Sequence, residues 1–157
     1  MARDTWYRLD NVGKFYSAEA GDATQTVFRF SATLVDEVDA DILQHAVEKT
    51  VQVFPSFNVC LRSGMFWHYL EQANEPPVVH PENLPICFGL HVDTKSVLFR
   101  VSYYKDRINL EVSHIIADGR GAMSFLETLL HAYIQERYDL EDIPFKYDGS
   151  DFQKAEN

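Results

Sequence analysis

Apolar residues recur at every second position in three segments of the chain, the period of a β-strand with one face in a core. Residues 26–35 alternate in this way, as do residues 97–103 and 108–114. Lys105-Asp106-Arg107 lies between the last two segments and is typical of a hairpin turn. We therefore predict one strand over 26–35 and a hairpin over 97–114. The core face of the first strand would carry Phe28, Phe30, Ala32 and Leu34.

Two other segments show the three- and four-residue spacing of an amphipathic helix. The first would begin after Asp39, a favourable N-cap, and end at Pro55. Its inward face would consist of Ile42, Leu43, Ala46, Val47, Thr50, Val51 and Phe54. The second would run from about Gly121 to Tyr138, and its inward face would consist of Ala122, Phe125, Leu126, Leu129, Leu130, Tyr133 and Ile134.

The remaining segments have weaker patterns. Residues 57–62 and 65–71 favour a second hairpin joined at Ser63-Gly64, where glycine would supply the positive φ of a tight turn. Residues 74–85 hold four of the six prolines and are expected to form a loop. Residues 1–25 are expected to be an irregular arm with at most a short helix. On the second strand, a core or interface role is favoured over a ligand channel for the aromatic residues Phe66, Trp67 and Tyr69.

These elements predict an α+β fold in which two long helices pack on a mixed, mostly antiparallel sheet. A chain of 157 residues with 46% apolar content can bury one core, so a single domain is expected over residues 1–138. Residues 139–157 are acidic and poor in apolar residues. This stretch is expected to be a disordered tail or a truncated linker.

Charge and cysteine content exclude several classes of function. With 24 acidic against 14 basic residues, the net charge of −10 would repel a phosphate backbone and argues against nucleic acid as a partner. Cys60 and Cys87 have no metal-like spacing, so we expect two buried, reduced thiols, no metal site and a cytoplasmic protein. No stretch approaches the roughly twenty apolar residues that a membrane span needs.

Candidate chemistry lies at the end of the segment 108–114, where His114 is followed by Asp118, Gly119 and the second helix. If the strand continues to its end, His114 faces the buried side with Val112, and Asn109, Glu111 and Ser113 face the other way. Burial favours the neutral imidazole, the form that a general base needs. A loop in which Asp118 caps the helix and Gly119 makes the turn fits the same residues.

The HxxxDG pattern of residues 114–119, after a strand and before a helix, resembles the active-site motif of the CoA-dependent acyltransferase superfamily. That superfamily includes chloramphenicol acetyltransferase, alcohol acetyltransferases and the condensation domains of peptide synthetases. The opening segment Trp6-Tyr7-Arg8-Leu9-Asp10-Asn11-Val12-Gly13-Lys14 is similar to the start of bacterial alcohol-acetyltransferase-like proteins. The resemblance implies one lobe, the N-terminal one, of a chloramphenicol acetyltransferase-like fold with two lobes.

The resemblance also implies a reaction. An acyl group would pass from acetyl-CoA or another acyl thioester, including a carrier-bound one, to a small-molecule alcohol or amine, with His114 as general base and no permanently bound cofactor. Asp118 would be structural, bonding an arginine of the other lobe, and Gly119 would keep the channel beside the histidine open. Many members carry a second histidine just before the catalytic one, and this chain has Ser113 there.

Three hypotheses follow for a chain that resembles one lobe. It is active only when joined to the second lobe of the same protein, or two copies pair as a homodimer, or it is a non-catalytic binding module that retains the HxxxDG turn. A large exposed apolar patch on the sheet beside His114 would favour either of the first two. We find no donor for an oxyanion, an interaction that contributes about 3 kcal/mol in acyl transfer, so the isolated chain is expected to be a poor catalyst.

Overall fold

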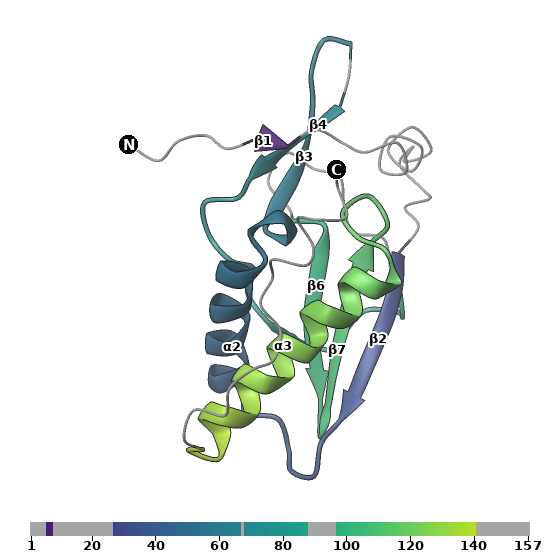
Figure 1. The fold of residues 1–157 in the computed structure, drawn as a ribbon. Helices are drawn as coiled ribbons and strands as arrows, with labels where there is room; N and C mark the ends of the chain where they lie inside the picture. Colours follow the sequence, from purple (N-terminus) through teal and green to yellow (C-terminus); the bar gives the residue numbers. More distant parts are fainter. Residues whose placement is uncertain (1–5, 8–26, 67, 88–96, 141–157) are drawn as a thin grey trace.

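The computed structural model describes residues 6–7, 27–66, 68–87 and 97–140. Its elements, in chain order, are β1 (Trp6–Tyr7), β2 (Val27–Thr33), α2 (Ala40–Val53), the 3-10 turn η1 (Pro55–Phe57), β3 (Val59–Ser63), β4 (His68–Gln72), β5 (His80–Pro81), β6 (Phe99–Tyr104), β7 (Arg107–Ser113) and α3 (Gly119–Arg137). Two long helices lie across one face of the larger sheet (Figure 1). The predicted α+β class is confirmed, and most of the predicted tail lies outside the described residues.

The larger sheet has the strand order β2-β7-β6-β5. Strand β7 pairs antiparallel with both β2 and β6, and the register sets Val112 opposite Phe28 on one side and Phe99 on the other. Only β5 runs parallel, so the sheet is mixed and mostly antiparallel, as predicted. The alternation of each strand places its apolar side chains on the helix side. The core there includes Leu43, Ala46, Val47, Phe99, Val101, Ile108, Leu110, Phe125 and Leu129.

Both long helices begin at a capping aspartate. The Asp39 carboxylate accepts hydrogen bonds from the backbone N–H groups of Asp41 and Ile42, and α2 ends just before Pro55, as predicted. Helix α3 begins at Gly119, two residues before the predicted start, because Asp118 accepts a hydrogen bond from Gly121 N and caps the first turn. Periodicity alone marks the apolar face of a helix, whereas the cap decides where it starts.

A smaller sheet with the order β1-β4-β3 stands at one end of the molecule, and its hairpin projects from the body (Figure 1). Ser63 pairs with His68, so four residues join the two strands. The predicted tight turn at Ser63-Gly64 is wrong, because Gly64 has no positive φ and the longer connection needs none. The side chain of Phe66 is 86% exposed, so Phe66 does not belong to the core of this chain, and an interface role stays a prediction. Trp67 lies outside the described residues.

Two short strands occur where the sequence predicts irregular chain. Strand β1 pairs antiparallel with β4, and β5 pairs with β6 inside the proline-rich segment 74–85. Pro81 is tolerated in β5 because this strand lies at the edge of the sheet. In each case the pairing strand is distant in the sequence, so no local pattern indicates the pairing.

Cys60 is buried, whereas Cys87 is only partly buried, and both are free thiols. The prediction that both are buried is therefore wrong for Cys87, which lies in the loop after β5. Among the described residues, no helix is long and apolar enough to cross a membrane.

Candidate functional site

The HxxxDG segment leaves the central strand through a short turn. Strand β7 ends at Ser113, and the next residues turn so that the backbone N–H of Ile116 donates to the carbonyl of Ser113 at 3.1 Å. The buried Ser113 hydroxyl also accepts a hydrogen bond from the N–H of Ile115 at 3.3 Å. His114 therefore belongs to the turn and not to the strand, and it is partly exposed. Ser113 closes the turn.

The His114 imidazole lies against an aromatic ring of the neighbouring strand. Its centroid is 4.4 Å from that of Phe28, and the two ring planes are inclined by 37°. Phe28, on β2, lies opposite Val112 of β7 and packs against the main core. The imidazole thus lies next to a side chain of the helix-facing side of the sheet, the side on which alternation predicts it.

The residues between His114 and Asp118 anchor the turn in two apolar clusters. Ile115 is buried in a small cluster beneath the smaller sheet, whose other members are Val59, Leu61, Leu70 and Leu98. Ile116 contacts both this cluster and the main core, and Ala117 packs against the main core. The three unspecified positions of HxxxDG are therefore apolar anchors that fix the backbone next to the histidine.

Asp118 and Gly119 begin helix α3. The carboxylate of Asp118 accepts a hydrogen bond from Gly121 N at 2.8 Å and is otherwise exposed. Among the described residues, a Cβ at position 119 would meet the ring of Phe30 at an ordinary 3.9 Å, and Gly119 has no positive φ. Within the described part of this chain, nothing requires glycine at position 119.

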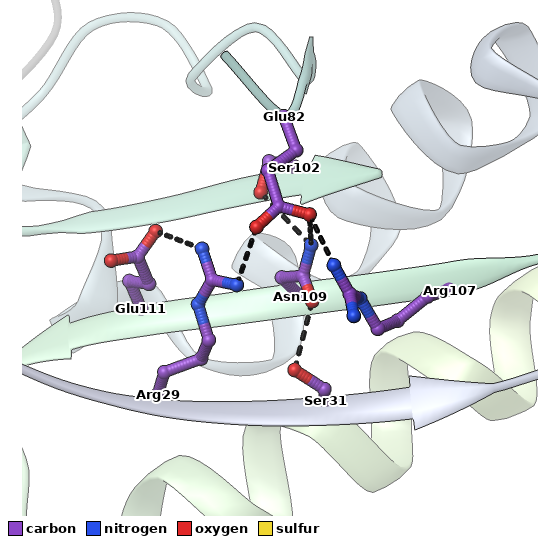
Figure 2. A network of polar contacts seen from close by, with 7 residues as sticks. All are labelled: Arg29, Ser31, Glu82, Ser102, Arg107, Asn109 and Glu111. Atoms are coloured by element: carbon purple, nitrogen blue, oxygen red, sulfur yellow. Dashed lines mark hydrogen bonds and ion pairs between the residues drawn. The ribbon is translucent and has the colours of Figure 1, made fainter. Parts of the chain in front are cut away.

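The opposite face of the sheet carries a buried polar network (Figure 2). Asn109, Glu111 and Ser113 were expected to lie on the face away from the core, and they are all buried, with exposures of 2% or less. The guanidinium of Arg29 on β2 donates to Glu82 at 2.7 Å and to Glu111 at 3.1 Å. The backbone N–H of Glu82 donates to Tyr103 O beside the edge of the sheet, and the Glu82 side chain reaches the polar residues of this face.

Glu82 is the centre of this network. Its second carboxylate oxygen accepts hydrogen bonds from Arg107 and from the amide of Asn109, and Asn109 in turn accepts from the hydroxyl of Ser31 (Figure 2). Hydrogen bonds from Arg29 and Arg107 hold the pKa of the Glu82 carboxyl below its ordinary value. Glu82 thus links the segment after β5 to strand β2 through Arg29, and to strand β7 through Arg107 and Asn109.

The structure brings together Ser113, His114, Asp118 and Gly119, the four candidate residues of the sequence, in one strand–turn–helix segment. Sequence reasoning missed Phe28 and the anchoring isoleucines as parts of the site. The core-face parity of Phe28 was visible, but its nearness to His114 depends on the β2–β7 register. Among the described residues, no group of three histidine, cysteine or acidic side chains gathers to hold a metal ion.

No protein-family model and no curated protein matches this sequence. Solved structures do match. The starter condensation domain of the rhizomide synthetase RzmA superposes with a TM-score of 0.72 at 11% identity, covering 95% of this chain and 44% of that one. The SgcC5 protein from Streptomyces globisporus gives a TM-score of 0.68 at 15% identity, over 96% of this chain and 41% of that one.

Polyketide synthase associated protein 5 from Mycobacterium tuberculosis gives a TM-score of 0.60 at 16% identity, over 84% of this chain and 33% of that one. The chain has the fold of one condensation-domain lobe. It spans less than half the length of each of these solved structures. At such low identities the likeness establishes the condensation-domain fold alone, and the closeness to alcohol acetyltransferases remains a prediction from the sequence.

Proposed function

We propose that this chain is the N-terminal lobe of an acyltransferase that moves an acyl group from a CoA or carrier thioester to an alcohol or amine, with His114 as general base. The observation that carries the proposal is the presentation of the His114 imidazole. It leaves the end of a central strand on a turn that Ser113 closes and Ile115 anchors, and its ring lies against Phe28. A base held on rigid elements suits a reaction that needs precise geometry.

In the proposed reaction, the acceptor oxygen or nitrogen forms a bond to the thioester carbonyl carbon while His114 takes the acceptor's proton. The tetrahedral intermediate then collapses, the carbon–sulfur bond breaks, and the proton passes from His114 to the departing thiolate. The products are an ester or amide and a free thiol. No covalent enzyme intermediate, oxidant or further co-reactant is needed, so the atoms and charges balance.

The proposal includes a second structural unit. This chain covers less than half of each matched solved structure. That partial coverage supports a partner unit around His114. That unit is either the second lobe of the same protein or a second copy of the chain. It would supply the oxyanion donor and the contacts to the thioester, and it would face Gly119.

Replacement of the histidine tests the proposal directly. In the protein assembled with its second unit, His114→Ala should lower acyl transfer at least about 10²-fold, because a positioned base contributes that much or more. Transfer is measured as thiol release from acetyl-CoA with a primary alcohol or amine. Circular dichroism should show an unchanged fold, since the side chain is partly exposed.

His68→Ala is the matched control, because His68 is an exposed histidine on β4 and has no place in the turn. This variant should retain the wild-type rate. Equal turnover by wild type and His114→Ala would remove the catalytic role.

A second candidate is a non-catalytic, homodimeric binding module that retains the HxxxDG turn. One observation favours it: the described hydrogen bonds of Ser113 and Asp118 are those that a turn and a helix cap need without any chemistry. Under this alternative, the chain sediments as a dimer and neither wild type nor His114→Ala releases thiol. Thiol release that depends on His114 decides for the acyltransferase.

A further inference from the structure

We propose that Phe28 is a positioning residue for His114, holding the imidazole in the one orientation from which it can take the acceptor's proton. This inference rests on the proposed function of His114. It starts from the ring contact, with centroids 4.4 Å apart and planes inclined by 37°. That geometry is a close, tilted aromatic contact, and such contacts favour particular orientations of both rings.

A base on a turn needs more than a fixed backbone. Ser113 and Ile115 hold the main chain at the histidine, whereas the orientation of the imidazole is set by its two side-chain torsions and by the groups that its ring contacts. Phe28 presents a flat face, and the neighbouring strand holds that face at the level of Val112, directly beside the end of β7. Rotations that would drive the imidazole into this face are excluded.

Phe28 itself is fixed from two directions. On the core side its ring meets Phe30 edge-on, at 5.7 Å and 82°. On the other face of the strand the next residue, Arg29, is bonded to Glu82 and Glu111. The side chains of consecutive strand residues point to opposite faces, so the ion pairs of Arg29 oppose any sliding of the strand that carries Phe28.

The contact also restricts how an acceptor can approach. Phe28 covers one face of the imidazole, so the acceptor hydroxyl or amine must meet a ring nitrogen at the edge, where its lone pair lies in the ring plane. Without the aromatic ring of Phe28, His114 would still be present, but its imidazole would adopt several orientations. Misorientation of a base lowers the turnover number and leaves thioester binding intact.

Three variants test the inference. Phe28→Leu keeps an apolar side chain but removes the flat ring, Phe28→Tyr restores the ring, and Phe99→Leu removes a ring from the far side of Val112 as a matched control. In the assembled protein, Phe28→Leu should lower kcat about 10- to 100-fold with the KM for acetyl-CoA unchanged. Phe28→Tyr should restore most of kcat.

Nuclear magnetic resonance on the chain itself supplies a readout that does not need turnover. Wild type should show nuclear Overhauser contacts between the Phe28 ring protons and the His114 ring protons, with the histidine assigned from His114→Gln. Phe28→Leu should show averaging of the His114 side-chain rotamers. Phe99→Leu should lower the melting temperature and leave the His114 signals unchanged.

The outcomes separate the two proposals. Absence of the Phe28–His114 contacts in wild type overturns the positioning role, whatever the activity. Unchanged kcat in Phe28→Leu, with His114→Ala inactive, overturns positioning and leaves the proposed function standing. Full activity of His114→Ala overturns the proposed function and, with it, any catalytic consequence of the contact.

Discussion

Asp118 has a structural partner inside this chain, whatever else it meets in a larger assembly. Its carboxylate caps α3 through Gly121 N. Asp118→Ala should therefore lower the free energy of unfolding by about 1 kcal/mol, because one N–H at the helix start loses its acceptor. Urea unfolding followed by circular dichroism measures the change. Glu127→Ala, at an exposed position of the same helix, should stay within about 0.5 kcal/mol of wild type. An equal effect of the two substitutions would refute the capping role.

Local sequence patterns predict some residues of the candidate site but not their long-range contacts. His114, Asp118 and Gly119 were predicted as site residues from their spacing, from the strand and helix patterns around them and from the resemblance of HxxxDG to a known motif, all of which are local signals. The partner of His114 was not identified, because Phe28 lies 86 positions earlier and meets it only through the pairing of β2 with β7. The burial of Glu111 was missed for a similar reason: its carboxylate pairs with Arg29 on the neighbouring strand, and no periodicity connects these two residues.

At the scale of elements, ion pairs hold the segment after β5 to the sheet. Glu82 joins it to the sheet through Arg29 and Arg107, and these bonds lower the pKa of its carboxyl. A depressed pKa in the folded state contributes stability above the unfolded-state value of 4.5, and the contribution is lost as pH falls through the folded value. The stability of wild type should therefore fall on acidification below about pH 5.

Glu82→Gln tests this dependence. Near neutral pH it should cost roughly 2 kcal/mol, because hydrogen bonds to two guanidinium groups lose their charge. Its unfolding free energy should change less than that of wild type between about pH 5 and pH 3. Glu75→Gln, at an exposed position of the segment before β5, is the control and should keep the wild-type slope. Parallel acid limbs for wild type and Glu82→Gln would contradict the assignment.

Helices and long strands were predicted well because their signals are local. Asp39, Pro55 and the apolar spacing between them bound α2 without reference to any other segment. Strands β1 and β5 have two residues each and exist only where a distant strand pairs with them. Alternation can predict a strand only over several residues, so strands of two residues cannot be recognised in this way.

Across the whole molecule, two apolar clusters unite the larger and the smaller sheet. The hairpin β3–β4 shows both kinds of apolar position: Leu70 is 7% exposed in the small cluster, whereas Phe66 is 86% exposed at the tip. Leu70→Ala should cost about 2–5 kcal/mol through lost burial and a residual cavity. Phe66→Ser should change the unfolding free energy by no more than about 0.5 kcal/mol. Thermal unfolding of the two variants checks this contrast, and a large loss with Phe66→Ser would mean that the tip packs against something in solution.

Ile116 contacts both clusters at the foot of the histidine turn. A destabilising substitution in the β3–β4 hairpin should therefore displace the proposed base, His114, through the side chains of Ile115 and Ile116. No residue that a substrate would touch needs to change. A random-mutagenesis screen scored by enzymatic output would recover lesions in β3 and β4 alongside those at His114. Substitutions that reshape the small cluster should therefore also shift the histidine turn, since Ile115 and Ile116 belong to both.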